Sequence, residues 1–260
     1  MDTGNCEKNE VIRVFKRYLG GNENGRRLLG SNEVKNFFCD LFCGGDIIPR
    51  DAPDMVCVKG STALIIEHFE FDSYRAGRKG SKSKQEQARI IQKFKSLEIP
   101  KEGLLYTDTI HGKNSYEDYI KNLTTNFNAH YKKIETYKQN LLKEGLIVSE
   151  MDIKVAFLIE DTSPLPCEYI ERGKGWIRRE AIEILYAPEF LTLLENSPKV
   201  DYVLSFSKTS EGYSVGFIDR NDVSLYKEES IDYQSKKFME WDNNVRMSGF
   251  IDRIKNSKKN

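Results

Sequence analysis

Residues 53–72 (PDMVCVKGSTALIIEHFEFD) constrain the fold of this chain more than any other stretch. Residues 55–58 form a short β-rich run, and residues 63–71 form a longer run that is rich in Ile and Phe. The polar segment 59–62 between them (KGST) has the composition of a tight turn. The pattern therefore predicts two apolar strands joined as a β-hairpin.

The register of this hairpin determines which acidic residues become neighbours. If the ends of the turn pair first, at about residues 59 and 62, Asp54 falls opposite residue 67. Successive side chains of a strand point to opposite faces. One face of the second strand therefore carries Ile65, Glu67, Phe69 and Phe71, and the other carries Ile66, His68, Glu70 and Asp72.

Asp54 and Glu67 form a candidate metal site. A carboxylate in an apolar strand is costly unless it is compensated, and two neighbouring carboxylates repel each other unless a cation or a shared proton lies between them. A hard cation such as Mg²⁺ takes oxygen ligands of this kind. The structural alternative is that Asp54 forms an Asx turn after Pro53 and that Glu67 faces solvent on an edge strand.

The overall composition excludes several classes of protein. The 40 basic and 40 acidic residues cancel, so a basic surface for nucleic acid must be local. Residues 1–5 do not resemble a signal peptide, and no apolar run approaches the thickness of a bilayer. The five cysteines lack CxxC spacing, which favours buried free thiols and a reducing, cytoplasmic location.

The remaining elements are predicted from hydrophobic periodicity and from turn residues. Residues 154–159 read as a buried strand, parallel to the central hairpin after a long helical crossover. Strands over 200–207 and 213–218 are predicted to form a second hairpin. Helices are predicted over residues 8–19, 32–43 (with Ser31 as N-cap), 84–97, 114–143, 188–194 and 231–254, and residues 162–180 as a long connection.

A basic segment follows the central hairpin. Residues 73–84 (SYRAGRKGSKSK) combine glycine, serine and clustered cations, which indicates a mobile loop. This composition alone favours a solvated loop tip, whereas beside a candidate metal site contact with phosphate groups has equal weight. Its cations are Arg75, Arg78, Lys79, Lys82 and Lys84.

The order helix, Pro-Asp strand, turn, acidic strand and helix resembles the core of the PD-(D/E)xK nuclease superfamily. The resemblance covers residues 31–97 and extends to about 160, where Asp54 matches the motif's Asp and Glu67 its second acid. Glu33 is the candidate for the acid that many members place on the preceding helix. The resemblance implies one or two Mg²⁺ or Mn²⁺ ions that activate water and stabilise charge on phosphate.

The chain departs from this motif at its lysine, because position 69 is Phe69. Some members carry the lysine on the following helix, where Lys82, Lys84 or Gln85 is the candidate. The alternative is a fold that has kept its shape and lost its chemistry. Phosphate-loop, GxSxG and HExxH motifs are absent from the sequence.

These observations predict one α/β (α+β) domain over residues 1–260, with a restriction-endonuclease-like mixed sheet flanked by helices. Its nuclease-like core spans about 31–160, and a C-terminal β-hairpin and helix are elaborations. The expected function is hydrolysis of DNA or RNA, with Asp54 and Glu67 as metal ligands and Lys82 or Lys84 as the catalytic cation. Arg75, Arg78 and Lys79 are expected to bind the nucleic-acid backbone. The alternatives are a non-catalytic nucleic-acid-binding module and a protein-interaction module.

Overall fold

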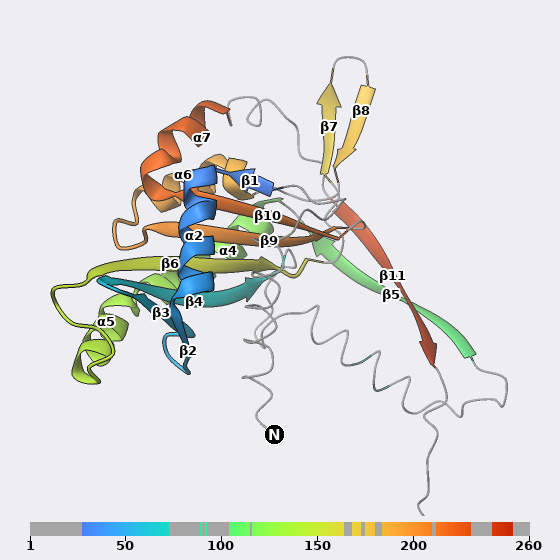
Figure 1. The fold of residues 1–260 in the computed structure, drawn as a ribbon. Coiled ribbons are helices and arrows are strands. Elements are labelled where there is room, and N and C mark those ends of the chain that lie inside the picture. The colour runs from blue at the N-terminus through green and yellow to red at the C-terminus, as the bar shows by residue number, and fades with distance from the viewer. Residues whose placement is uncertain are drawn as a thin grey trace, which may run out of the picture.

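The computed structural model of the chain is a mixed α/β structure built on a large sheet (Figure 1). It describes residues 28–72, 89, 92, 104–114, 116–163, 168–172, 175–179, 184–209, 212–229 and 241–251. The predicted helix over 8–19 lies outside the described residues. So does the predicted helix over 84–97, apart from Arg89 and Gln92, which are helical.

Seven strands form the large sheet in the order β1-β10-β9-β6-β4-β3-β2. Strands β4, β6 and β9 run parallel at its centre, and β1 runs parallel to β10, whereas the other neighbours are antiparallel. The predicted α/β fold class and the parallel pairing of residues 154–159 with the central hairpin are confirmed. The strand bounds are Leu28–Gly30 (β1), Asp46–Pro49 (β2), Met55–Lys59 (β3), Thr62–Phe71 (β4), Asp152–Asp161 (β6), Tyr202–Thr209 (β9) and Gly212–Asp219 (β10).

Helices cover both faces of this sheet. Helix α2 lies across one face, and α4 lies behind the strands in Figure 1. Leu64, Ile66 and Leu158 pack toward α2, whereas Ile65 and Phe157 belong to the larger core that includes α4, α5, α6 and α7. The bounds are Asn32–Gly44 (α2), Tyr116–Tyr131 (α4), Ile134–Lys143 (α5), Pro188–Glu195 (α6) and Val223–Glu229 (α7), with 3₁₀ turns at Ile184–Tyr186 (η1) and Arg220–Asp222 (η2).

Helix α2 has the predicted limits. The Ser31 hydroxyl accepts a hydrogen bond of 3.1 Å from the Glu33 amide, and Gly45 ends the helix. A Cβ at Gly45 would lie 2.7 Å from the Leu41 carbonyl oxygen and 2.9 Å from the Cys57 sulfur. The end of α2 therefore lies so close to β3 that a larger residue at position 45 would displace it.

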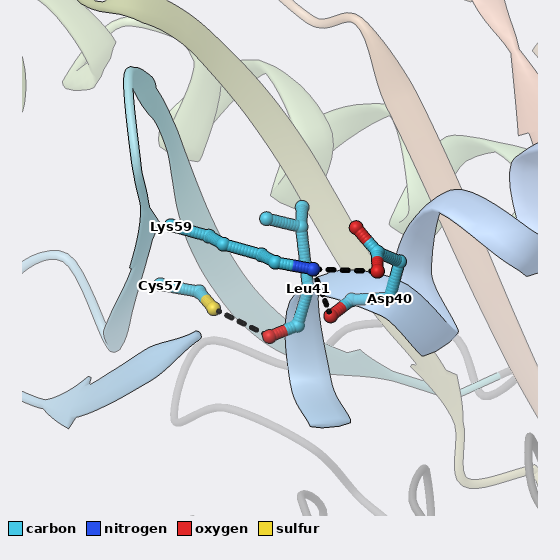
Figure 2. Close-up of polar contacts among 4 residues, drawn as sticks. All are labelled: Asp40, Leu41, Cys57 and Lys59. Carbon is cyan, nitrogen blue, oxygen red and sulfur yellow. Dashed lines mark hydrogen bonds and ion pairs between the residues drawn. The ribbon is translucent and has the colours of Figure 1, made fainter. Parts of the chain in front are cut away.

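Polar contacts attach the end of α2 to β3 (Figure 2). The Lys59 ammonium donates to the Asp40 carboxylate at 2.5 Å and to the Asp40 carbonyl oxygen at 3.3 Å. The buried Cys57 thiol donates to the Leu41 carbonyl at 3.4 Å. A lysine at a helix C-terminus also favours the negative end of the helix dipole. These contacts are structural. Cys57 is buried and forms no disulfide with the described residues, as the sequence predicts, whereas Cys43 is exposed.

Three predicted elements were wrong in extent or type. The helix expected over 114–143 is two helices, because Lys133 bonds to the His130 carbonyl in a tight turn that redirects the chain. The predicted connection over 162–180 contains a hairpin of β7 (Glu168–Arg172) and β8 (Gly175–Arg179).

The predicted terminal helix over 231–254 instead contains β11 (Trp241–Ile251). Along its eleven residues β11 pairs antiparallel with β5 (Leu104–Asn114), for which no strand was predicted. Backbone groups that a helix would satisfy internally are thus satisfied by a distant segment. Figure 1 shows the two strands as a twisted ribbon beside the large sheet.

Candidate metal site

The β3–β4 hairpin brings Asp54 to Glu67, as its turn and register predict. Lys59 pairs with Thr62 and Met55 pairs with Ile66, so Asp54 follows as the next position of the ladder. Its Oδ2 accepts a hydrogen bond of 2.7 Å from the backbone amide of His68. Asp54 is therefore fixed beside the middle of β4.

Glu67 is a buried carboxylate inside an apolar strand. It is 4 % exposed and lies on the face of β4 that packs against α4 and α5. Oε1 accepts a hydrogen bond of 2.6 Å from the Tyr137 hydroxyl and lies 2.6 Å from Nδ1 of His130. Oε2 is also buried, and none of the described residues forms a hydrogen bond with it. The two oxygens of one carboxylate thus have very different environments.

The ring of His130 is held by an aromatic neighbour. Phe69 stacks on it with ring centroids 5.0 Å apart and an interplanar angle of 17°. An ionised Glu67 can only accept hydrogen bonds, so Nδ1 of His130 is assigned as the protonated nitrogen. Phe69, which occupies the position expected for the lysine, therefore supports His130 as a hydrogen-bond donor to Glu67.

The carboxylates of Glu67 and Asp54 both act on the hydroxyl of Tyr137. Burial raises the pKa of its hydroxyl, and the hydrogen bond to Glu67 and the charges of Glu67 and Asp54 raise it further. Each of these effects opposes ionisation of the phenol. Tyr137 therefore remains a neutral donor to Glu67 across the physiological pH range.

The donors present fit a divalent cation in part. Mg²⁺ is commonly bound by one or two carboxylates, with waters and substrate phosphates as its other ligands. Asp54 and Glu67 supply two carboxylates, and Oε2 of Glu67 is a buried oxygen that no described residue bonds and whose charge a cation would compensate. Among the described residues, no three His, Cys, Asp or Glu side chains gather closely enough to hold a metal ion.

The structure does not bring Glu33 to this pair. Helix α2 packs through Val34 and Phe38 on the face of Leu64 and Ile66, opposite to that of Glu67. The exposed Glu33 instead lies near Asp222, whose pKa is raised by burial, by Asp219 and by Glu33. Glu33 lies in the first turn of α2, where its carboxylate favours the helix dipole and its amide donates to Ser31, so a structural role accounts for it.

The predicted cationic residues lie outside the part of the chain that the structure describes. This holds for the catalytic candidates Lys82 and Lys84 and for the backbone-binding candidates Arg75, Arg78 and Lys79. Their roles therefore stay predictions from the sequence.

The histidine of β4 lies on the other face of the sheet, as strand alternation predicts. Nε2 of His68 is 3.1 Å from Oε2 of Glu160 on the neighbouring strand β6. Both side chains are partly exposed, at 20 % and 35 %. The side chain of His68 is thus separated from Glu67, although its backbone amide holds Asp54.

A second buried carboxyl lies at the end of β6. Asp161 is 3 % exposed, and its Oδ2 accepts a hydrogen bond of 3.0 Å from the Tyr119 hydroxyl. Its Oδ1 accepts one of 2.8 Å from the Ser163 amide. Burial raises the pKa of Asp161 to about 6, the bonds from Ser163 and Tyr119 oppose this, and the charge of Asp72 adds to it.

Sequence reasoning missed His130 and Tyr137. Neither residue is among the candidate site residues that the sequence suggests. Their spacing of seven residues would place them on one face of a single continuous helix, but His130 belongs to α4 and Tyr137 to α5, so this spacing is not what brings them together. That spacing on its own does not identify Glu67 as their partner.

Comparisons with protein families, with curated proteins and with solved structures found no match for the chain. The described part of the chain contains no helix with the length and apolar character needed to cross a membrane.

Proposed function

We propose that this protein is a metal-dependent phosphodiesterase that hydrolyses DNA or RNA. The observation that supports the proposal best is the pairing of Asp54 with Glu67, whose buried Oε2 has no hydrogen-bond partner in the described structure. Burying an ionised oxygen without a partner is costly, and a divalent cation between two carboxylates removes that cost. Mg²⁺ or Mn²⁺ is the proposed ion.

The residues of the chain have distinct tasks in this proposal. The bound cation would act as a Lewis acid on the scissile phosphate and lower the pKa of the attacking water. Asp54, held by the His68 amide, and Glu67, held by Tyr137 and His130, bind the cation. Lys82 or Lys84 steadies the water or the phosphate.

The nucleic-acid backbone is assigned to the basic segment. Arg75, Arg78 and Lys79 would neutralise phosphates, so affinity should fall as salt rises. The chain has no net charge that could supply a general attraction to nucleic acid. Replacing these three cations should therefore weaken binding more than replacing three scattered lysines.

A second candidate is a binding module without catalysis, or one that docks another protein. The observation that favours it is Phe69, which stands in the place of the motif's lysine and packs on His130. With Phe69 at this position, β4 lacks the lysine side chain that such a catalytic site uses. In this alternative, the contacts of Tyr137 and His130 with Oε1 are the only compensation that Glu67 receives from the described residues.

The test is cleavage of single-stranded DNA, double-stranded DNA and RNA in Mn²⁺ by the full chain. Asp54→Asn and Glu67→Gln remove one charge each and preserve side-chain shape, and both should lower cleavage by about 100-fold or more. Asp40→Asn is the matched control, because Asp40 is an exposed acid on α2 that pairs with Lys59. Mn²⁺ should also raise the melting temperature of the wild type and of the control.

The two candidates give different results. Cleavage that persists in both site variants would refute the proposed site. No cleavage and no Mn²⁺-dependent stabilisation, together with salt-sensitive binding of nucleic acid, would establish the binding module instead.

A further inference from the structure

The hydrogen bonds to Glu67 are distributed unequally between its two oxygens. Both donors, the Tyr137 hydroxyl and Nδ1 of His130, contact Oε1 at 2.6 Å. Oε2 is buried and receives no hydrogen bond from the described residues. We infer that Tyr137 and His130 are positioning residues that make Glu67 a one-oxygen ligand, with Oε2 as the atom that binds a divalent cation. This inference rests on the proposed function.

The number of acceptor positions explains why Oε1 is excluded as a ligand. A carboxylate oxygen has about two lone-pair directions. Two short donors occupy those of Oε1, so a cation bound to both oxygens would have to displace Tyr137 or His130. Oε2 is buried, and no described residue occupies its acceptor positions.

The surroundings hold this arrangement rigidly. Phe69 stacks on His130, and Phe157 packs edge-on against Phe69 with centroids 5.8 Å apart. Tyr137 and Glu67 are both buried. The donors come from α4 and α5, while Glu67 belongs to β4, so packing of the helices on the sheet sets the orientation of the carboxylate.

The same contacts account for Phe69. A lysine there would extend from β4 beside Glu67, whereas the phenylalanine supports a histidine that reaches Glu67 from α4. The donor to the carboxylate is thus supplied by the helix instead of the strand. Phe69 therefore helps to position His130 in the proposed site.

The experiment measures Mn²⁺ affinity directly, by electron paramagnetic resonance of free Mn²⁺ or by calorimetry, on the full chain. Tyr137→Phe removes one hydroxyl and should weaken Mn²⁺ binding about 10- to 100-fold, as loss of a residue that orients a ligand commonly does. Tyr116→Phe is the matched control, because the Tyr116 hydroxyl donates at 2.8 Å to Glu189, away from Glu67. Its affinity should equal that of the wild type.

His130 gives a second, independent comparison. Asparagine places an N–H close to the position of Nδ1, whereas leucine has no donor. His130→Asn should retain most of the Mn²⁺ affinity, and His130→Leu should lose as much as Tyr137→Phe. For Tyr137→Phe and His130→Leu, the Mn²⁺ concentration for half-maximal cleavage should rise while kcat at saturating Mn²⁺ changes little. Melting temperatures in EDTA establish that each variant is folded.

The outcomes separate the two levels of the proposal. Wild-type affinity in Tyr137→Phe and in His130→Leu would overturn the positioning role and leave the metal site intact. Equal losses in His130→Asn and His130→Leu would overturn the role of the donated hydrogen bond. A wild-type protein that does not bind Mn²⁺ would overturn the proposed function, and this inference with it.

Discussion

Two buried carboxyl groups of the same sheet, Glu67 on β4 and Asp161 on β6, differ in how their oxygens are satisfied. Each accepts a hydrogen bond from a tyrosine of the covering helices, Tyr137 for Glu67 and Tyr119 for Asp161. Both oxygens of Asp161 accept a hydrogen bond, Oδ2 from the Tyr119 hydroxyl and Oδ1 from the Ser163 amide. Glu67 has two donors on Oε1 and none, among the described residues, on Oε2.

The positions of the two acids explain this difference. Asp161 ends β6, and the amide of Ser163, two residues further on, donates a hydrogen bond to it. Glu67 lies within β4, and its donors are 63 and 70 residues away in the chain. The backbone next to Asp161 thus supplies one of the hydrogen bonds that this buried acid needs. Glu67 has no such local donor, and none of the described residues bonds its Oε2. The proposed cation would compensate the charge of this buried oxygen.

The largest expected effect contrasts the neutral analogues of the two acids. Glu67→Gln should lower kcat/KM for nucleic-acid cleavage by about 100-fold or more, because a catalytic cation contributes several kcal/mol and each 1.36 kcal/mol is tenfold in rate. Asp161→Asn should leave cleavage little changed, since both oxygens of Asp161 are satisfied within the chain. Initial rates at saturating Mn²⁺ measure both. A comparable loss in Asp161→Asn would show that the distinction between the two acids is wrong.

The second effect concerns stability and pH. The folded protein holds the proton of Asp161 up to a pKa of about 6, whereas the unfolded chain releases it near 3.8. Between these values the folded state binds more protons, so the unfolding free energy falls as pH rises, by about 3 kcal/mol in all. Above pH 6 this group causes no further change. Asp161→Asn lacks this contribution.

Urea unfolding at intervals from pH 4 to pH 7 tests this sign. The stability of the wild type minus that of Asp161→Asn should decrease over this range, which removes the contributions of all other titrating groups that the two proteins share. A difference that increased with pH would mean that Asp161 is stabilised as an anion. Asp161 would then behave like a cation ligand, and the contrast drawn between Asp161 and Glu67 would be wrong.

The sequence predicts the Asp54–Glu67 pair because every step is local. Gly60, with φ of +58°, and its neighbours form a short turn, the period of two fixes the faces, and counting back from residues 59 and 62 reaches the two acids. The partners of Glu67 depend instead on how the α4–α5 crossover packs on the sheet. No local pattern specifies which face of that crossover meets β4.

The same limit explains the error at the C-terminus. Trp241–Ile251 was predicted to be helical, and it forms a strand because it pairs with Leu104–Asn114 far away in the chain. Strand formation depends strongly on such distant partners, whereas the ends of α2 depend on Ser31 and Gly45 beside it. The predicted helix ends of α2 were therefore accurate, and the terminal helix was not.

The smallest expected effect concerns Tyr119, the counterpart of Tyr137. Tyr119→Phe should lower the unfolding free energy by about 1 kcal/mol, the usual contribution of one hydrogen bond. Mn²⁺ should stabilise this variant as much as it stabilises the wild type, because Tyr119 acts on Asp161 and not on the proposed cation site. Tyr137→Phe should gain less from Mn²⁺ than the wild type, since stabilisation by a ligand falls as its affinity falls. Urea unfolding in EDTA and in Mn²⁺ measures all four values and their wild-type references. If Mn²⁺ stabilised Tyr119→Phe less than the wild type, the end of β6 would belong to the same cation site as Glu67, and the two acids would be parts of one centre.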